Sequence, residues 1–174
     1  DNEPYVLPEW RADDSRPTVI ADYIELNQQL SKLADQYELV FGIDIPFWWD
    51  VRDETGQAKF LYSTEQGSVP ILEALFPLVD NVGIMSYRDR VTGPNGLVAL
   101  CKSEFQLCMN LGVDVLAAAE LGAGDDVEPG TTFGVYPWKY FRTQLNTLER
   151  VLPRTPGCTG MAIHYATPFM EAMK

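Results

Sequence analysis

The sequence is poor in histidine and in basic residues. His164 is the single histidine among 174 residues, which excludes any site that needs two imidazole groups. Lysine and arginine total 13 against 25 aspartates and glutamates, a formal net charge of −12 at pH 7. A surface of this sign repels phosphate backbones and anionic lipid headgroups, so we expect neither nucleic acid nor a membrane as a partner.

Long apolar runs are also absent. No window of 18 apolar residues occurs, so no membrane span is expected, and no basic-then-apolar leader resembles a signal peptide. The chain begins at Asp1 rather than at a methionine, as a processed or excised piece of a longer protein would. With 46% hydrophobic residues, the sequence predicts one soluble domain over residues 1–174. The localisation stays open, with a secreted protein or a processed fragment as the two options.

The three cysteines lack the close spacing of a zinc or redox motif. Cys101 and Cys108 are seven positions apart on a predicted helix, roughly 10 Å along its axis, which is too far for a disulfide. We therefore expect these two thiols and that of Cys158 to be buried and free. The sequence indicates neither a metal site nor a cofactor.

Apolar strand segments alternate with amphipathic helical segments along the chain. Strands are expected at residues 39–45, 81–87, 113–120 and 160–165, and helices near 15–37, 68–78, 95–111, 138–152 and 167–174. Ser68 is expected to cap the second helix, after a polar, turn-rich segment at residues 52–67. Such alternation predicts an α/β fold of parallel strands joined by right-handed crossovers.

About four strand–helix units fit two architectures. One is half of an eight-stranded (β/α)8 barrel, a fold of about 250 residues when complete. The other is an open, doubly wound parallel sheet. Neither glycine-rich phosphate-binding motif, G-x-G-x-x-G or G-x-x-x-x-G-K-[ST], follows a predicted strand, so the nucleotide-binding forms of the open sheet lose their main support.

The apolar segment at residues 113–119 ends abruptly in Glu120. A near-continuous apolar run is typical of a strand covered on both faces, and Gly112 and Gly122 flank it with turn signals. Glu120 is therefore expected at the carboxyl end of a parallel strand. Proteins of this class place their chemistry at that edge of the sheet.

Acidic and aromatic residues follow the other predicted strands as well. The expected group at this edge comprises Asp44, Trp48, Trp49, Tyr87, Arg88, Glu120, His164 and Tyr165, together with Tyr136 from a later loop. Glycoside cleavage uses two carboxyl groups, about 5 Å apart for retention of configuration and wider apart for inversion. Aromatic rings pack on the apolar faces of sugars. The residue types therefore indicate a carbohydrate ligand.

Two short motifs resemble the retaining (β/α)8-barrel glycoside hydrolases of the cellulase type. Asn2-Glu3-Pro4 looks like the end of their fourth strand, where the glutamate is the acid/base. Glu120-Leu121-Gly122 looks like the end of their seventh strand, where the glutamate is the nucleophile. The resemblance implies that Glu3 and Glu120 are catalytic, and that the chain is the C-terminal half of a TIM barrel.

A further motif gives a second, competing resemblance, because it is similar to the end of the sixth strand of chitinase-like barrels. It runs from Gly83 to Arg88, and its tyrosine, Tyr87, would help position an acetamido group. Arg88 stands where that family commonly has an acidic residue. Asp1-Asn2-Glu3 would then be the tail of an Asp-x-Glu acid motif, which implies that Glu3 is the sole acid and that Glu120 is not a nucleophile.

The same residues also have interpretations in which they stabilise the fold and take no part in catalysis. Trp48 and Trp49 are adjacent, so we expect one in the core and one facing a cleft. A histidine on an apolar strand, such as His164, is more often a hydrogen-bonded core residue than a catalyst. Asp44 lies within an apolar strand, so we expect a buried carboxylate that is paired and that orients Arg88.

The opposing class of function is a non-catalytic module that binds carbohydrate or is purely structural. A half barrel leaves two open sheet edges and an apolar inner face. We therefore expect either a homodimer that completes the barrel or a missing N-terminal half. The acidic run at residues 125–128 is expected to be a solvated loop, because it lacks the alternating oxygen ligands of a calcium site.

Overall fold

The computed structural model describes residues 3–124 and 127–172. The chain divides into two compact units: Asp1–Gly42 with Trp48–Asp80, and Ile43–Phe47 with Asn81–Lys174. Across the described residues, the helices are too short or too polar to cross a bilayer.

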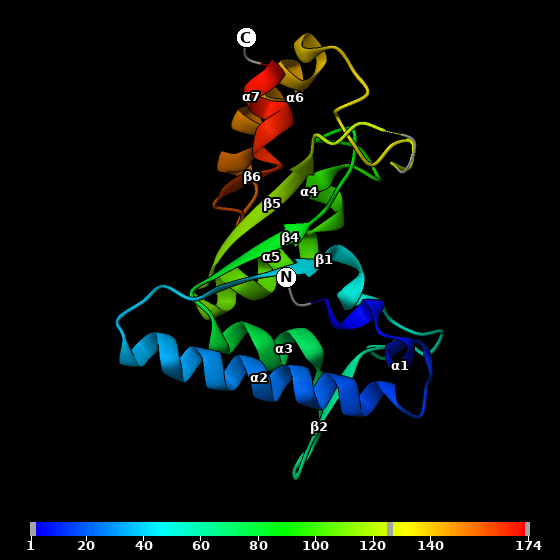
Figure 1. The fold of residues 1–174 in the computed structure, drawn as a ribbon, viewed down its shortest axis with the longest axis vertical. Helices are drawn as coiled ribbons and strands as arrows, with labels where there is room; N and C mark the ends of the chain where they lie inside the picture. Colours follow the sequence, from blue (N-terminus) through cyan, green and yellow to red (C-terminus); the bar gives the residue numbers. More distant parts are fainter. Residues whose placement is uncertain (1–2, 125–126, 173–174) are drawn as a thin grey trace. The chain divides into compact units, whose positions relative to one another are not determined.

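A four-stranded parallel sheet organises the second unit. Its strands are β1 (Gly42–Pro46), β4 (Asn81–Met85), β5 (Asp114–Glu120) and β6 (Gly160–His164), in the spatial order β1-β4-β5-β6 (Figure 1). Gly83 pairs with Leu116 across β4 and β5, and Glu120 pairs with His164 across β5 and β6. The expected α/β fold with parallel strands is confirmed.

The helices of the second unit follow the strands as the sequence predicts, with one difference. They are α4 (Leu97–Leu100), α5 (Lys102–Leu111), α6 (Trp138–Val151), η4 (Leu152–Arg154) and α7 (Ala166–Ala172). The single helix expected at residues 95–111 is broken at Cys101, whose backbone leaves the helical region at ψ 14°. Gly112 ends α5 in the left-handed conformation at φ +73°, which a residue without a Cβ adopts at low cost.

The two faces of β5 have different environments. Ala117 and Ala119 are fully buried, and Ala119 belongs to a core cluster with Phe141 and Leu148 of α6. On the opposite face, Leu116 and Glu120 are half-buried, and only the small side chain of Ala118 between them is buried. Helices therefore cover one face of the strand, while the other face, which carries Glu120, is more open.

The first unit contains two short helices and one long helix before β1: η1 (Pro4–Val6), α1 (Pro8–Arg11) and α2 (Arg16–Gln36). Beyond β1 lie η2 (Phe47–Asp50), β2 (Leu61–Thr64), β3 (Gly67–Pro70), α3 (Ile71–Leu75) and η3 (Phe76–Leu78). In Figure 1, α3 runs beside α2.

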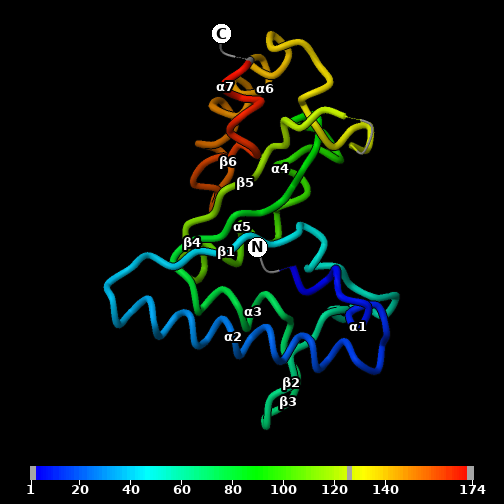
Figure 2. Tube along the Cα trace, viewed as in Figure 1, coloured from blue at the N-terminus to red at the C-terminus, as the bar shows by residue number. Residues whose placement is uncertain are grey.

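A β-hairpin replaces part of the expected turn-rich segment of the first unit. β2 and β3 pair antiparallel, with Ser63 opposite Ser68, and Figure 2 shows the two strands side by side. The expectation that Ser68 caps a helix is therefore wrong. The hairpin occupies Ser68, and the helix begins only at Ile71, after Pro70.

Candidate active site at the carboxyl edge of the sheet

The carboxylate of Glu120 lies at the carboxyl end of β5 and has two partners. Its Oε2 is 2.5 Å from Nδ1 of His164, and its Oε1 accepts a hydrogen bond from the backbone N–H of Gly122. The Glu120 side chain is 12% exposed. A Cβ on residue 122 would lie 2.8 Å from Oε1 of Glu120 and 3.5 Å from the ring of Tyr165. Glycine at this position lets the backbone return close to the carboxylate.

His164 links this carboxylate to two tyrosine rings. A carboxylate only accepts hydrogen bonds, so Nδ1 of His164 is the donor in this pair. The ring stacks on Tyr87 at a centroid distance of 5.6 Å and an interplanar angle of 18°, and it contacts the ring of Tyr165 at 5.1 Å. The His164–Tyr165 peptide bond is cis. Because the His164 side chain is 53% exposed, the expectation of a core histidine is wrong.

The hydroxyl of Thr132 forms hydrogen bonds that connect the turn after Glu120 to the following loop. Its hydroxyl lies 2.6 Å from the carbonyl oxygen of Gly122 and 3.1 Å from that of Glu120, and it accepts a bond from Gly134 N–H. The N–H of Phe133 donates to the Glu120 carbonyl at 2.8 Å. Thr132 was not predicted as a site residue. Its only sequence signal is a hydroxyl residue at the end of a glycine-rich loop.

The register places Asp44 and Glu120 on the same face of the sheet, but far apart. The Asp44 carboxylate occupies the space in front of Gly83, where a Cβ would collide with its Oδ1. Gly83 pairs with Leu116, and Glu120 lies four residues beyond Leu116, which corresponds to roughly 13 Å along the strand. Asp44 is therefore too distant to be the second carboxylate of a retaining glycosidase, which requires about 5 Å.

Asp44 and Arg88 do not form the expected pair. Asp44 is exposed rather than buried, because it lies on β1 at the edge of the sheet. Arg88 donates to the carbonyl oxygen of Tyr87 at 2.6 Å and lies 4.7 Å from the centroid of the Phe47 ring. Within the described part of the chain, no ion pair joins Arg88 to Asp44.

The two tryptophans differ in burial. Trp49 is 2% exposed and packs on Trp10 at a ring distance of 5.7 Å, within the first unit. Trp48 is half-buried and contacts the ring of Tyr5 edge-on at 5.5 Å. Trp49 therefore has no free face on which a sugar could pack, whereas Trp48 keeps part of its surface accessible.

Glu3 belongs to the first unit and Glu120 to the second. Glu3 is half-buried, and its carbonyl oxygen accepts a hydrogen bond from Val6 N–H at 3.1 Å. The neighbouring residues of its motif, Asp1 and Asn2, lie outside the described residues, as do Asp125 and Asp126 of the acidic run. The pairing of Glu3 with Glu120 stays a prediction.

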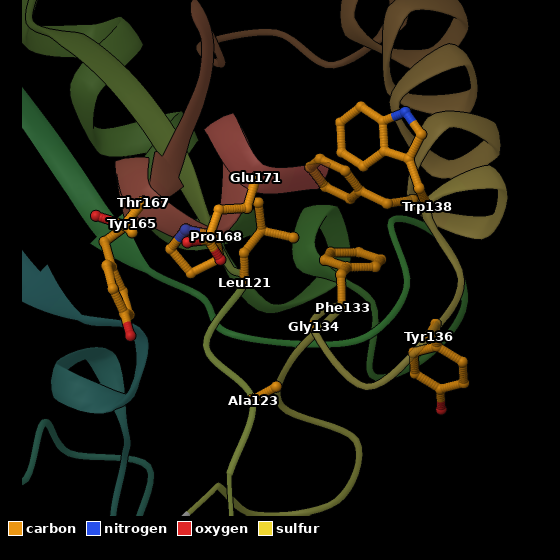
Figure 3. A pocket seen from close by; sticks show the side chains of 11 residues that line it. Leu121, Ala123, Phe133, Gly134, Tyr136, Trp138, Tyr165, Thr167, Pro168 and Glu171 are labelled. Carbon is orange, nitrogen blue, oxygen red and sulfur yellow. The ribbon is translucent and has the colours of Figure 1, made fainter. Parts of the chain in front are cut away.

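A cavity of about 390 Å³ opens beside the Glu120 turn (Figure 3). Its lining comes from the residues after β5, the start of α6 and the segment from β6 into α7: Leu121, Ala123, Phe133, Gly134, Tyr136, Trp138, Phe141, Tyr165, Thr167, Pro168 and Glu171. Five of these eleven residues are aromatic, and Glu171 is the one carboxylate among the described lining residues. Glu120 and His164 are not among the lining residues that the structure describes, but Tyr165, which lines the cavity, contacts the ring of His164.

Tyr136 connects the cavity to a second hydrogen-bonded pair. Its side chain is part of the exposed surface, and its hydroxyl donates to Oδ2 of Asp89 at 2.7 Å. That hydrogen bond, followed by the negative charge of Asp89, raises the pKa of Tyr136 above its ordinary value. Asp89 also accepts from Nε of Arg90 at 3.0 Å. Asp89 thus fixes the direction of the Tyr136 hydroxyl, which in Figure 3 points away from the other labelled residues of the cavity.

Across residues 3–124 and 127–172, no group of three or more histidine, cysteine, aspartate or glutamate side chains is placed to hold a metal ion. In the part of the chain that the structure describes, the three cysteines form no disulfide. Cys101 and Cys108 are buried as expected, whereas Cys158 is only half-buried. The chemistry available at this edge is therefore that of an oriented carboxylate, an imidazole and phenol groups.

Comparison of the chain with protein-family models, with curated proteins and with solved structures yields no match.

Proposed function

We propose that this chain is a glycoside-hydrolase-like domain in which Glu120 is the nucleophile. The observation that carries the proposal is the Glu120 carboxylate, held at the end of a parallel strand by Gly122 N–H and His164 Nδ1. Each carboxylate oxygen has two acceptor positions, so each retains one after these bonds. A carboxylate oxygen with a fixed direction, near the exposed ring of Tyr165 and the half-buried ring of Tyr87, suits attack on the anomeric carbon of a sugar.

The strand order supports a partial barrel rather than a doubly wound sheet. The four parallel strands follow one another in chain order, β1-β4-β5-β6. A doubly wound sheet reverses its order at a switch point, whereas a (β/α)8 barrel adds each strand beside the previous one. The covered and open faces of β5 also match the outer and inner faces of a barrel wall. We therefore propose that these strands are the last four of such a barrel.

The second carboxyl group in this proposal is Glu3. In the first step, an oxygen of Glu120 bonds to the anomeric carbon while the bond to the leaving oxygen breaks, and Glu3 gives its proton to that oxygen. In the second step, Glu3 takes a proton from water, and the resulting hydroxide releases the sugar from Glu120. This scheme needs the two carboxyl groups about 5 Å apart.

A panel of aryl glycosides tests the proposal. We expect Glu120→Gln to lose at least about a thousandfold in turnover, because the attacking oxyanion is gone. Glu149→Gln, an exposed glutamate on α6, is the matched control and should leave turnover unchanged. Glu3→Gln should slow poor leaving groups much more than 2,4-dinitrophenol, which needs no proton. Turnover that survives Glu120→Gln would refute the nucleophile assignment.

A second candidate is a non-catalytic carbohydrate-binding module. The cavity beside Glu120 favours it, since Tyr165 and Tyr136 line the cavity and are exposed. Exposed aromatic faces bind sugars without any chemistry. In that case the chain binds oligosaccharides but turns none over, and Glu120→Gln leaves the affinity nearly unchanged.

The sheet also supports a proposal about partners. In the described residues, β1 and β6 each have a neighbouring strand on one side only. Unpaired strand edges recruit further strands. We propose that the sheet is completed by a second copy of the chain or by an N-terminal half barrel. Sedimentation should then show a dimer or a complex with the added half, and a compact monomer that takes up no dye specific for apolar surfaces would contradict this.

A further inference from the structure

We propose that a second cavity, on the helical side of the second unit, binds a free amphipathic organic anion: a monoacid with an apolar tail. The cavity has a volume of about 800 Å³, within the range of about 300–1,000 Å³ that is usual for small-molecule sites. It lies among α4, α5 and the end of α6, and it shares no lining residue with the cavity beside Glu120.

Most of the surface area that lines this cavity is apolar. The apolar lining residues are Val98, Ala99, Phe105, Val151 and Pro156, and the remaining ones are Thr92, Gly93, Lys102, Ser103, Gln106, Arg154 and Thr155. An apolar surface of this kind gains free energy when a hydrocarbon tail displaces water from it.

The charged lining residues are both cations. Lys102 and Arg154 line the cavity, and none of the other lining residues that the structure describes is a carboxylate. This is unexpected in a chain with 13 basic and 25 acidic residues. Neither cation forms an ion pair with any residue that the structure describes. Helix stability does not account for Lys102, because it is the first residue of α5, where the helix dipole disfavours a positive charge.

Several polar groups of the lining are already engaged within the protein. The hydroxyl of Thr155 donates to the carbonyl of Val151 at 2.8 Å, and the amide of Gln106 donates to Asn110 at 3.0 Å. The hydroxyl of Ser103 donates to Glu104 at 3.2 Å. The two cations therefore supply the headgroup contacts, and the apolar walls supply the contact with the tail. That pattern favours an anion with an apolar body and disfavours a cation.

Calorimetric titration of the full chain with octanoate, below its micelle concentration, tests this proposal. We expect saturable binding of one octanoate per chain. Acetate supplies the headgroup without the tail and should not bind measurably. Octyltrimethylammonium supplies the tail with the opposite charge and should bind at least about tenfold more weakly, since it meets two cations rather than a counter-charge.

Substitutions of lining residues test whether octanoate binds in this cavity. Lys102→Gln and Arg154→Gln should each weaken octanoate binding about threefold to fivefold, as expected for exposed charge pairs, and the double variant should weaken it further. Ala99→Trp should abolish binding by filling the cavity. Lys139→Gln, an exposed lysine on α6 outside this lining, is the control and should bind normally.

Circular dichroism of each variant separates a lost site from a lost fold. Because the two glutamine variants change exposed side chains, they keep the test valid even if Ala99→Trp fails to fold. Absence of octanoate binding, equal binding of octanoate and octyltrimethylammonium, or full affinity in the double variant would each overturn the proposal.

Discussion

His164 and Glu120 join the carboxyl ends of two neighbouring strands, with Nδ1 of the histidine 2.5 Å from Oε2 of the glutamate. The strand register brings them together, because the two residues are direct partners across β5 and β6. They are 44 positions apart in the chain. The contact therefore exists only when the parallel sheet has formed, and it fixes one oxygen of the carboxylate while Gly122 fixes the other.

Replacing His164 should alter the direction of the Glu120 carboxylate with little effect on stability. His164→Phe keeps a ring to stack on Tyr87 but removes the Nδ1 donor, whereas His164→Asn places an amide donor near the same position. Since the histidine side chain is 53% exposed, we expect His164→Phe to change the free energy of unfolding by less than about 1 kcal/mol.

The expected effect on glycoside turnover is larger. A misdirected carboxylate should lower turnover about tenfold to a hundredfold in His164→Phe, and His164→Asn should recover part of it. The NMR shift of the Gly122 amide gives a readout that does not depend on activity, because this N–H donates to the same carboxylate. An unchanged Gly122 shift in His164→Phe would show that the imidazole does not orient Glu120.

The contact between Asp44 and Gly83 can be used to test whether the Asp44 carboxylate lies over β4 on the same face of the sheet as Glu120. A Cβ on residue 83 collides with Oδ1 of Asp44 and lies 3.1 Å from its Cγ. We expect Gly83→Ala to destabilise the protein by about 1 kcal/mol, the lower end of the overpacking range, because the exposed Asp44 carboxylate can turn away from the added methyl group. The same change in an Asp44→Ala background should cost clearly less, because the obstructing carboxylate is gone.

Urea unfolding of the unchanged protein, Gly83→Ala, Asp44→Ala and the double variant measures the coupling free energy between residues 44 and 83. Gly124→Ala is the control, since a Cβ at that position meets no atom of the described residues within 4 Å, and it should be close to neutral. Equal costs of Gly83→Ala in both backgrounds would mean that Asp44 does not occupy the space in front of β4.

Buried thiols should make the native protein resistant to thiol reagents. Burial, and then the charge of Glu104, raises the pKa of Cys108 from an ordinary 9.0 to about 12. At pH 8 the reactive thiolate fraction is then on the order of 10⁻⁴. Burial also raises the pKa of Cys158, which is half-buried. We expect Ellman's reagent to label Cys158 first and slowly, and Cys101 and Cys108 only on unfolding.

The raised pKa of Cys108 also predicts how stability depends on pH. Below about pH 9 the thiol is protonated in both the folded and the unfolded chain, so its contribution to stability is fully present. Between pH 9 and about 12 the unfolded chain ionises first, and this contribution is lost progressively. Cys108→Ala should remove that part of the alkaline decline in urea unfolding. Rapid labelling of Cys108 in the native protein at pH 8 would contradict this account.

Several features of the fold could be read from local sequence, because they depend on neighbouring residues alone. The apolar run that ends at Glu120 and Gly122 predicts β5 and its terminus, and Gly112 marks the end of α5 as a residue that tolerates positive φ. Periodic apolar residues likewise predict the helix at residues 138–152, observed at Trp138–Val151. These patterns repeat within a few residues, so no long-range contact is needed to interpret them.

Features that depend on pairing between distant segments were decided by the tertiary structure. Ser68 and Pro70 are as typical of a helix start as of a turn-bounded strand, and only the pairing of Ser68 with Ser63 produces the hairpin. Asp44 and His164 lie on apolar strands, which suggests burial, but β1 and β6 are the outer strands of the sheet and leave both side chains exposed. Adjacent side chains such as Trp48 and Trp49 are expected to point to opposite sides of the backbone, but only the packing of Trp49 on Trp10 determines that Trp49 is the buried one. The burial of a side chain depends on the position of its strand in the sheet and on what covers the face that it occupies, since Ile45 on the same strand as Asp44 is fully buried. Both follow from contacts tens of residues apart in the sequence.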